Sequence, residues 1–548
     1  MRSSCFFYWL ILWPLLMAAT SRGAPAQDPQ FLGKPLAKWQ NDLSDPDSTV
    51  RRSAAFALGK AGPSAVQAGP KLVRALKDKN AGVREAAAFA LGEIGPAASD
   101  EIIPALVDLL AKDQEPLVRR SAAFALGTLG RQTLATDDES STAIRAALEK
   151  ALADSQASVR QNAARSLGRL GAKKGGDSVG PLSKVLNDPD PLVRRAAAAA
   201  LGELGRSAQS AVPAVLSRFK DDTDTEVKKI SLSALVNLVG PENKSAAATL
   251  RTGLRSKDPE MVQAAALALA NIGGPEAAEA VPVLCRALAN KESNTRRLAS
   301  AGLAHLGPDA AAGVSSLTKA LADRDPIVRR NGALALGRVG VKAASAVPAL
   351  VKLVDSDQPA EIRIHAAEAL AHISPAIEPA IPVLRRVLEK DDNWQVRQRA
   401  VWALARLDNV EQAGVIPALT TVLSETEPET RLIRYDSAAV LGLLLRDRAP
   451  DKVIDVLQAL LGDKEVQVYT GSDAKVTSVG SESRAGETAV TRSGSGDCRG
   501  MAAYALGFIG RKANRPEIIR GLKEATQSSD AKVRQLASEA LRKIQGSD

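Results

Sequence analysis

The stretch VRRSAAFALGKAG at residues 50–62 returns with small changes along the whole chain. It reads VREAAAFALGEIG at 83–95, VRRSAAFALGTLG at 118–130 and VRRAAAAALGELG at 193–205, with later copies starting at Val328, Val396 and Val533. The spacing is mostly 33 to 35 residues, and about fourteen copies fit into the 548 residues. A repeat of this period is typical of a solenoid, in which each unit packs only on its neighbours.

Each repeat predicts two helices. Val50, Ala54, Ala57 and Leu58 fall on one helical stripe. Asp45 followed by Pro46 predicts the helix start, with Asp as the N-cap and Pro at the first helical position. A second apolar segment with an early proline, such as IIPALVDLLAKD at 102–113, predicts the partner helix. Aromatic residues make up only 3% of the chain, so the core must consist mainly of Ala, Leu, Val and Ile.

Two charged positions recur together: an Asp five residues before the Val, and an Arg directly after it. With this pattern the chain resembles HEAT repeats, in particular the bacterial branch of phycobilisome-lyase-type repeats, over residues 35–462 and 498–548. The resemblance implies an all-α, right-handed α-solenoid of about fourteen helix pairs. It also implies a ladder of Asp–Arg hydrogen bonds between repeats, which we interpret as structural because a catalytic group is needed only once. The main ladder residues are Asp45, Arg51, Asp78, Arg84, Asp113, Arg119, Asp188, Arg194, Asp323 and Arg329.

The pattern weakens in two places. Lys228 and Gln263 stand where we expect the ladder Arg, and Lys257 where we expect the Asp. The period then breaks at residues 463–497, which are rich in Ser, Gly and Thr. These residues predict an insertion between two helices, either a flexible loop or a small β-hairpin. The predicted organisation is thus a solenoid over 27–462, the insertion, and C-terminal repeats over 498–548.

Residues 1–26 resemble a secretory signal peptide. Arg2 precedes an apolar run that starts at Cys5, and Ala24-Pro25-Ala26 offers a cleavage site for signal peptidase. We therefore expect an exported protein, periplasmic or extracellular, with no membrane span after removal of this leader. Cys285 and Cys498 lie about six repeats apart, which predicts no disulfide between them.

No catalytic, cofactor or metal site is predicted. The three histidines lack the short spacing of a zinc pair, and there is no His-Glu dipeptide like those that hold the di-iron centre of HEAT-like hydroxylases. A lyase-like or oxidoreductase-like enzyme of this broad family, or an accessory to one, stays the alternative. The net charge is +10, but acids and bases alternate in every repeat, which disfavours a nucleic-acid binder.

A row of aromatic and basic residues suggests where a partner binds. Positions two and six after the Val leave the apolar stripe and share a helix face. Aromatic residues with Arg are the usual composition of interface hot spots. We therefore predict a scaffold that binds a protein or peptide along a concave groove; the alternative is that the three Phe only fill space between helices. The candidate binding residues are Arg52, Phe56, Phe89, Arg120, Phe124, Trp402 and Arg406.

Overall fold

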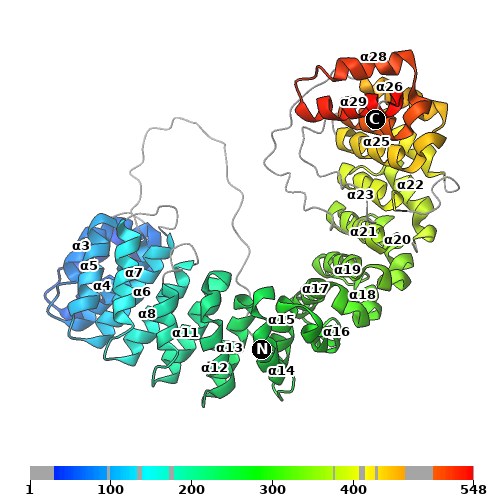
Figure 1. The fold of residues 1–548 in the computed structure, drawn as a ribbon. Coiled ribbons are helices and arrows are strands. Elements are labelled where there is room, and N and C mark those ends of the chain that lie inside the picture. Colours follow the sequence, from blue (N-terminus) through cyan, green and yellow to red (C-terminus); the bar gives the residue numbers. More distant parts are fainter. Residues whose placement is uncertain are drawn as a thin grey trace, which may run out of the picture. The chain divides into compact units, whose positions relative to one another are not determined.

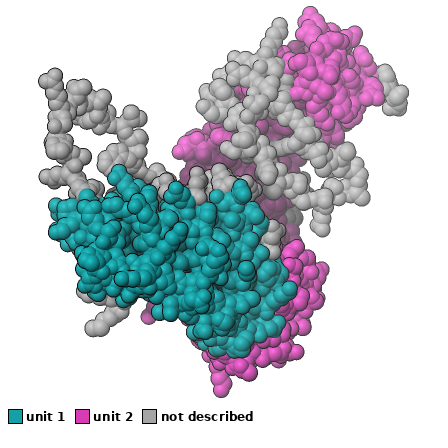
Figure 2. Space-filling view, turned by 90° about the vertical axis from the view of Figure 1, so that its left-hand side faces the viewer, with its two compact units in different colours: residues 1–204 teal, residues 205–548 magenta. Residues whose placement is uncertain are grey.

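The computed structural model describes residues 30–95, 99–132, 139–171, 178–373, 377–406, 414–425, 430–462 and 498–546. The chain divides into two compact units, Met1–Leu204 and Gly205–Asp548 (Figures 1 and 2). The predicted leader at 1–26 and the predicted insertion at 463–497 lie outside the described residues.

Unit 1 opens with a short β-hairpin and continues as helix pairs. Strand β1 (Gln30–Phe31) pairs antiparallel with β2 (Lys34–Pro35), and Trp39 Nε1 donates a hydrogen bond to the Phe31 carbonyl at 3.0 Å. The helices of unit 1 are α1 (Leu36–Asp42) with α2 (Ser48–Ala61), α3 (Gly69–Ala75) with α4 (Ala81–Ile94), α5 (Ser99–Lys112) with α6 (Pro116–Gln132), α7 (Glu139–Ala151) with α8 (Ala157–Arg169), and α10 (Val179–Val185) with α11 (Pro191–Leu204).

Unit 2 continues the same architecture. Its pairs are α12 (Val212–Asp221) with α13 (Thr225–Leu238), α14 (Ala247–Gly253) with α15 (Pro259–Ile272), α16 (Val281–Ala287) with α17 (Ser293–Leu306), α18 (Val314–Ala320) with α19 (Pro326–Val339), α20 (Val347–Val354) with α21 (Ala360–Ile373), α22 (Ile381–Lys390) with α23 (Trp394–Leu404), α24 (Val415–Leu423) with α25 (Arg431–Leu445), α26 (Asp451–Leu461) with α27 (Cys498–Ile509), and α28 (Pro516–Ala525) with α29 (Ala531–Gln545).

Short 3-10 segments lead into the first helix of several pairs or follow the second. They are η1 (Gly62–Ala68), η3 (Gly205–Ala211), η4 (Pro241–Ala246), η5 (Pro275–Ala280), η6 (Gly307–Gly313), η7 (Gly340–Ala346), η8 (Glu378–Ala380), η10 (Arg446–Arg448) and η11 (Gly510–Ala513). The predicted α-solenoid is confirmed, with fourteen helix pairs among the described residues. In each pair the second helix is the one that carries the Val-Arg motif or the residues that replace it, and we call it the Val-Arg helix.

The glycine of the Ala-Leu-Gly motif sets how closely successive Val-Arg helices approach. A Cβ added to Gly92 on α4 would lie 2.8 Å from the Cα of Ala125 on α6. Gly59 meets Ala90 in the same way in unit 1, and Gly337 meets Ala369 in unit 2. Any side chain larger than hydrogen would push these helices apart. Ala and Gly therefore build one tightly packed layer, while Leu and Val fill the space between the two helices of a pair.

The predicted helix starts need a correction. Asp47, not Asp45, is the N-cap of α2 and accepts the Thr49 N–H at 2.8 Å. Asp45 accepts the Asp47 N–H at 2.8 Å and thus belongs to the turn before the helix. Asp188 likewise accepts the N–H of Asp190, the residue directly before α11. The physical reason is that an Asp two residues before the cap can close the turn and still present its carboxylate to another repeat.

The register assigned to the weak repeat was wrong by one residue. Helix α15 begins at Pro259, and Ser256 Oγ accepts the Asp258 N–H at 3.1 Å, which is the bond that a ladder Asp makes elsewhere. Ser256, not Lys257, therefore occupies the Asp position. Six residues on, Val262 and not Gln263 occupies the Arg position. In this repeat the Arg that marks the register is absent, and Met261 takes the place of the usual Val.

Candidate functional site

Arginines of one repeat hold carboxylates of the next throughout unit 1. Arg51 Nε donates to Asp78 Oδ2 at 2.7 Å, and its Nη2 donates to Asp78 Oδ1 at 2.9 Å. The third nitrogen, Nη1, donates to the carbonyls of Asp45 and Pro46 within its own repeat. The same two-pronged arrangement joins Arg84 to Asp113, Arg119 to Asp154 and Arg160 to Asp188.

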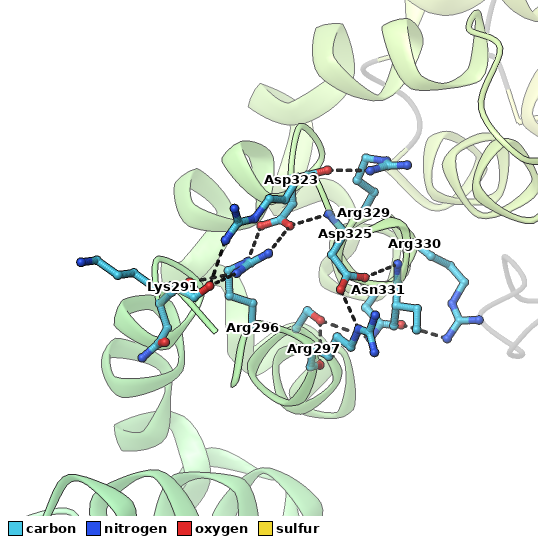
Figure 3. Close-up of polar contacts among 12 residues, drawn as sticks. Lys291, Arg296, Arg297, Asp323, Asp325, Arg329, Arg330 and Asn331 are labelled. Carbon is cyan, nitrogen blue, oxygen red and sulfur yellow. Dashed lines mark hydrogen bonds and ion pairs between the residues drawn. The ribbon is translucent and has the colours of Figure 1, made fainter. Parts of the chain in front are cut away.

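The ladder continues in unit 2 with substitutions (Figure 3). Arg296 binds Asp323 at 2.8 and 2.9 Å, and its Nη1 donates to the carbonyls of Asn290 and Lys291. Arg329 donates Nη1 to the Asp323 carbonyl, whereas its Nε donates to the side chain of Gln358 at 2.9 Å. A neutral amide thus replaces a carboxylate at one rung.

Two predicted ladder residues, Asp45 and Arg194, take part in hydrogen bonds of the turn before their own Val-Arg helix. Asp45 lies in the first repeat. Its backbone carbonyl accepts a hydrogen bond from Arg51, and its carboxylate accepts the Asp47 N–H within the turn. Arg194 donates Nη1 to the carbonyls of Asp188 and Pro189 at 2.9 and 3.1 Å.

The ladder shifts the ionisation of its carboxylates. The hydrogen bond from Arg51 lowers the pKa of Asp78 and outweighs the opposing effect of burial. For Asp113 and Asp154, burial by itself would raise the pKa, but hydrogen bonds from Arg84 or Arg119 and from the backbone hold it below the ordinary value. These carboxylates are therefore firmly ionised and fully occupied by hydrogen bonds, which suits a structural role rather than proton transfer.

The predicted aromatic row exists as one continuous stack on α2, α4 and α6. The ring centroids of Phe56 and Phe89 lie 5.8 Å apart with an interplanar angle of 20°. Those of Phe89 and Phe124 lie 6.1 Å apart at 18°. Phe56 is 51% exposed, while Phe89 and Phe124 are half-buried because each packs on its neighbours. We call these three residues the Phe stripe; they pack between helices and reach solvent at the same time.

Positive side chains border the Phe stripe. Lys60 Nζ lies 5.5 Å from the centroid of Phe56 and 5.1 Å from that of Phe89, between the two rings. Arg169 Cζ on α8 lies 5.3 Å from the centroid of Phe124. All three distances are within the range of a cation–π interaction. The two predicted arginines differ: Arg120 pairs with Glu85 at 3.2 Å, whereas Arg52 is exposed and makes no ion pair with any described residue.

A group of arginines extends the positive border at the end of the stripe. Arg131, Arg165 and Arg169 are exposed and lie close enough to Glu203 for their charges to act on it. Desolvation raises the pKa of the Glu203 carboxyl, and the three arginines oppose this shift. Lys60, Arg131 and Arg169 were not predicted from the sequence. Their signal was the helical spacing: Lys60 follows Phe56 by four residues on the same face.

Unit 2 presents a separate aromatic surface at the same helix positions. Trp402 on α23 is half-buried under Arg399, whose Cζ lies 4.2 Å from the ring centroid. Arg406 is exposed and donates Nη1 to the Ala371 carbonyl at 3.2 Å. Tyr504 and Phe508 on α27 were not predicted from the sequence. Their ring centroids lie 4.7 Å apart, and Lys543 Nζ lies 4.3 Å from the Phe508 centroid.

Two histidines of unit 2 make polar contacts within their own helices, and His305 Nδ1 lies 3.0 Å from the Ala301 carbonyl oxygen. His365 Nδ1 lies 3.3 Å from Glu368 Oε2, and this contact lowers the pKa of Glu368. Burial, helped by the charge of Arg406, lowers the pKa of His372. Within the described parts of the chain, no group of three or more His, Cys, Asp or Glu is placed to hold a metal ion.

One stretch of the described residues is long and apolar enough to cross a membrane, namely Pro326–Val354. It is not a single straight helix, because Gly340, with φ of +70°, separates α19 from η7 and α20. Both helices belong to helix pairs of the solenoid.

The comparison with protein families agrees with this architecture. A family model described as HEAT repeats matches residues 36–133, 144–236, 237–301, 281–371 and 381–472. A search of the curated proteins found no match. Among solved structures, the chain is similar to an engineered protein from the Northeast Structural Genomics Consortium, at 27% identity and a TM-score of 0.47, over 68% of this chain and 98% of that one. It is also similar to importin beta crystallised in ammonium sulfate, at 14% identity and a TM-score of 0.47, over 93% of this chain and 72% of that one.

Proposed function

Because this chain belongs to the HEAT-repeat family, we propose that it is a scaffold that binds a protein or peptide partner along its Val-Arg helix layer, without catalysis of its own. The phycobilisome-lyase-type branch stays a prediction. A solenoid offers a long surface built from many similar helices, and such surfaces suit extended partners. The ladder has a structural role in this account, because its charged groups already satisfy one another.

The Phe stripe is the observation that carries the proposal. Three stacked aromatic rings, at least one of them half exposed, stand beside Lys60 and Arg169. Isolated exposed apolar residues are ordinary on a protein surface, but an ordered aromatic row with cations has the composition of a binding hot spot. Stacking also fixes the rings before a partner arrives, which lowers the entropy cost of binding.

The packing of the Val-Arg helices supports a concave binding face. Their glycines and alanines allow a closer approach than larger side chains would, as between Gly92 and Ala125. In a stack of helix pairs, the layer with the closer spacing lies on the inside of the bend. We therefore propose that the Phe stripe faces the concave groove.

We also propose that the protein is exported, to the periplasm or outside the cell, and that its mature form begins near Gln27. The leader at 1–26 supports this proposal. N-terminal sequencing of the protein purified from its native host tests it: a start near Gln27 supports export, and an intact Met1 on the mature protein contradicts it.

Affinity capture with matched variants tests the binding function. The test variant is Phe56→Ser/Phe89→Ser/Phe124→Ser. The control is Val341→Ser, which removes an apolar side chain of similar exposure to Phe56, 60% against 51%, from η7 in unit 2, outside the Val-Arg helices. We expect the envelope fraction to yield a partner with the wild type and the control but not with the test variant. A partner that all three proteins capture equally would contradict the assigned site.

A further inference from the structure

The spacing of the Phe stripe matches an extended peptide. In an extended chain, every second side chain lies on the same side, about 6.6 Å apart at about 3.3 Å per residue. The ring centroids of the stripe are 5.8 and 6.1 Å apart, close to this repeat and to the slightly shorter one of a twisted strand. A strand that crosses α2, α4 and α6 can therefore place alternate apolar residues beside successive rings. Its other side chains then point to the opposite flank, where Lys60, Glu93 and Arg169 stand one helical turn after the row of Phe56, Phe89 and Arg165.

The orientation of the rings disfavours nucleic acid. Phe89 has a stacked ring on each side, so neither of its faces is available to a base. Proteins that bind single strands without sequence preference need such open faces. Glu85, Glu93 and Glu203 also lie on this helix face, where they would repel a uniformly charged phosphate chain.

The charges along the stripe specify an order of side chains. Lys60 lies between the first and second rings, and Arg169 lies beside the third, with Arg165 one turn earlier on the same helix. These three cations make no ion pair with any residue that the structure describes. On α4, the position that corresponds to Lys60 is Glu93. A carboxylate of the bound peptide is therefore favoured between the first and second rings and beyond the third ring, and it is disfavoured next to Glu93.

We propose that the Phe stripe binds an extended acidic peptide segment of the order apolar–acidic–apolar–non-acidic–apolar–acidic, read from α2 towards α8. This inference rests on the proposed function and names the chemistry of its partner. The apolar residues pack on Phe56, Phe89 and Phe124, one acidic residue pairs with Lys60, and the other pairs with Arg165 and Arg169.

Fluorescence anisotropy with the full chain tests the proposal. The probes are a labelled peptide Leu-Glu-Leu-Ser-Leu-Glu, its reversed sequence (for the opposite chain direction), and versions of both with Lys or Gln in place of Glu. We expect one acidic peptide to bind, its Lys version to bind at least tenfold more weakly, and its affinity to fall as salt rises. The Lys60→Glu variant should weaken binding about fivefold, because it removes an exposed charge pair, which contributes up to about fivefold, and puts a like charge in its place. Lys77→Glu, in the turn between α3 and α4, should leave binding within about twofold.

A second pair of variants tests the order of charges. Replacing the Ser of the bound peptide with Glu should weaken binding to the wild type, and Glu93→Gln should restore most of the loss. Circular dichroism checks that each variant keeps the helical content of the wild type. If Glu93→Gln does not restore binding of the peptide with Glu at the Ser position, the proposed order of charges is overturned.

The outcomes separate this inference from the proposed function. If the Gln or Lys peptides bind as tightly as the acidic ones and the Phe56→Ser/Phe89→Ser/Phe124→Ser variant loses them, the stripe is a binding site and only its acidic preference is wrong. If none of the peptides binds, the inference is overturned, and capture of a partner through the stripe decides the proposed function separately. Tighter binding of an oligothymidylate probe than of any peptide would overturn both.

Discussion

Arg119 and Asp154 form an ion pair with two parallel hydrogen bonds between neighbouring repeats. Arg119 Nε lies 2.7 Å from Asp154 Oδ2, Nη2 lies 2.8 Å from Oδ1, and both side chains are only 12% exposed. Arg119 Nη1 meanwhile donates to the carbonyls of Asp113 and Gln114 in its own repeat. One guanidinium thus fixes both the turn that precedes its helix and the start of the next Val-Arg helix.

Removing this Arg should destabilise unit 1. Hydrogen bonds to charged groups contribute about 1.5–3 kcal/mol, and solvent near the pair reduces this, so we expect a loss of about 1–2 kcal/mol for Arg119→Ala. Arg119→Lys should recover only part of it, because an ammonium cannot bind both carboxylate oxygens in the same plane. Arg52→Ala, which removes an exposed Arg without an ion pair, is the control. Denaturant unfolding followed by circular dichroism measures all three, and an unchanged midpoint for Arg119→Ala would contradict the structural role of the ladder.

The ladder should also make stability depend on pH in the acid range. The pKa values of Asp78, Asp113, Asp154 and Asp188 are lowered in the folded chain, so the unfolded chain binds protons first as the pH falls. Their contribution is fully present above the ordinary Asp pKa of about 3.9 and is lost as the pH falls through the lower, folded values. The unfolding midpoints of wild type and Asp154→Asn should therefore differ at pH 7 and converge below about pH 4. A difference that stays constant over this range would show that the charge of Asp154 does not matter.

The glycines of the motif should tolerate no side chain. Alanine is a better helix former than glycine by about 0.8–1 kcal/mol, so on propensity alone Gly92→Ala would be stabilising. We expect the opposite, because the new Cβ would meet the Ala125 backbone at 2.8 Å. Gly180 on α10 is the control, since no atom lies within 4 Å of its added Cβ. Thermal melting should show a lower midpoint for Gly92→Ala and an equal or higher one for Gly180→Ala; two equal shifts would refute the close-approach argument.

The Phe stripe should add modestly to stability. Aromatic pairs contribute about 0.5–1.5 kcal/mol beyond their burial, and the stripe holds two such pairs. Phe56→Ser/Phe89→Ser/Phe124→Ser should therefore lower the melting temperature without unfolding the chain, and Phe56→Ser alone should have the smallest effect of the three single changes. A triple variant that fails to fold would mean that the rings serve mainly as core.

The repeat could be predicted from the sequence because Val, Arg, Leu and Gly recur at fixed positions, and the Arg51–Asp78 contact follows from that recurrence. The predicted register was wrong by one residue at Val262, because this repeat lacks the Arg that marks the register. The half-burial of Phe89 and Phe124 could not be predicted, because it depends on how far Gly92 lets α4 and α6 approach. Tyr504 and Phe508 were missed because they follow the break at 463–497, after which the helix positions are harder to align.

Photo-crosslinking at a single residue tests the central claim most directly. The photoreactive amino acid p-benzoylphenylalanine replaces Phe56 on the stripe in one protein and Val341 on η7, which is also exposed, in another. Both are expressed in the native host and irradiated. We predict a crosslinked protein partner from position 56 and none from position 341. Equal crosslinking from both positions, or none from position 56 while position 341 reacts, would contradict the assignment of the Phe stripe as the binding face.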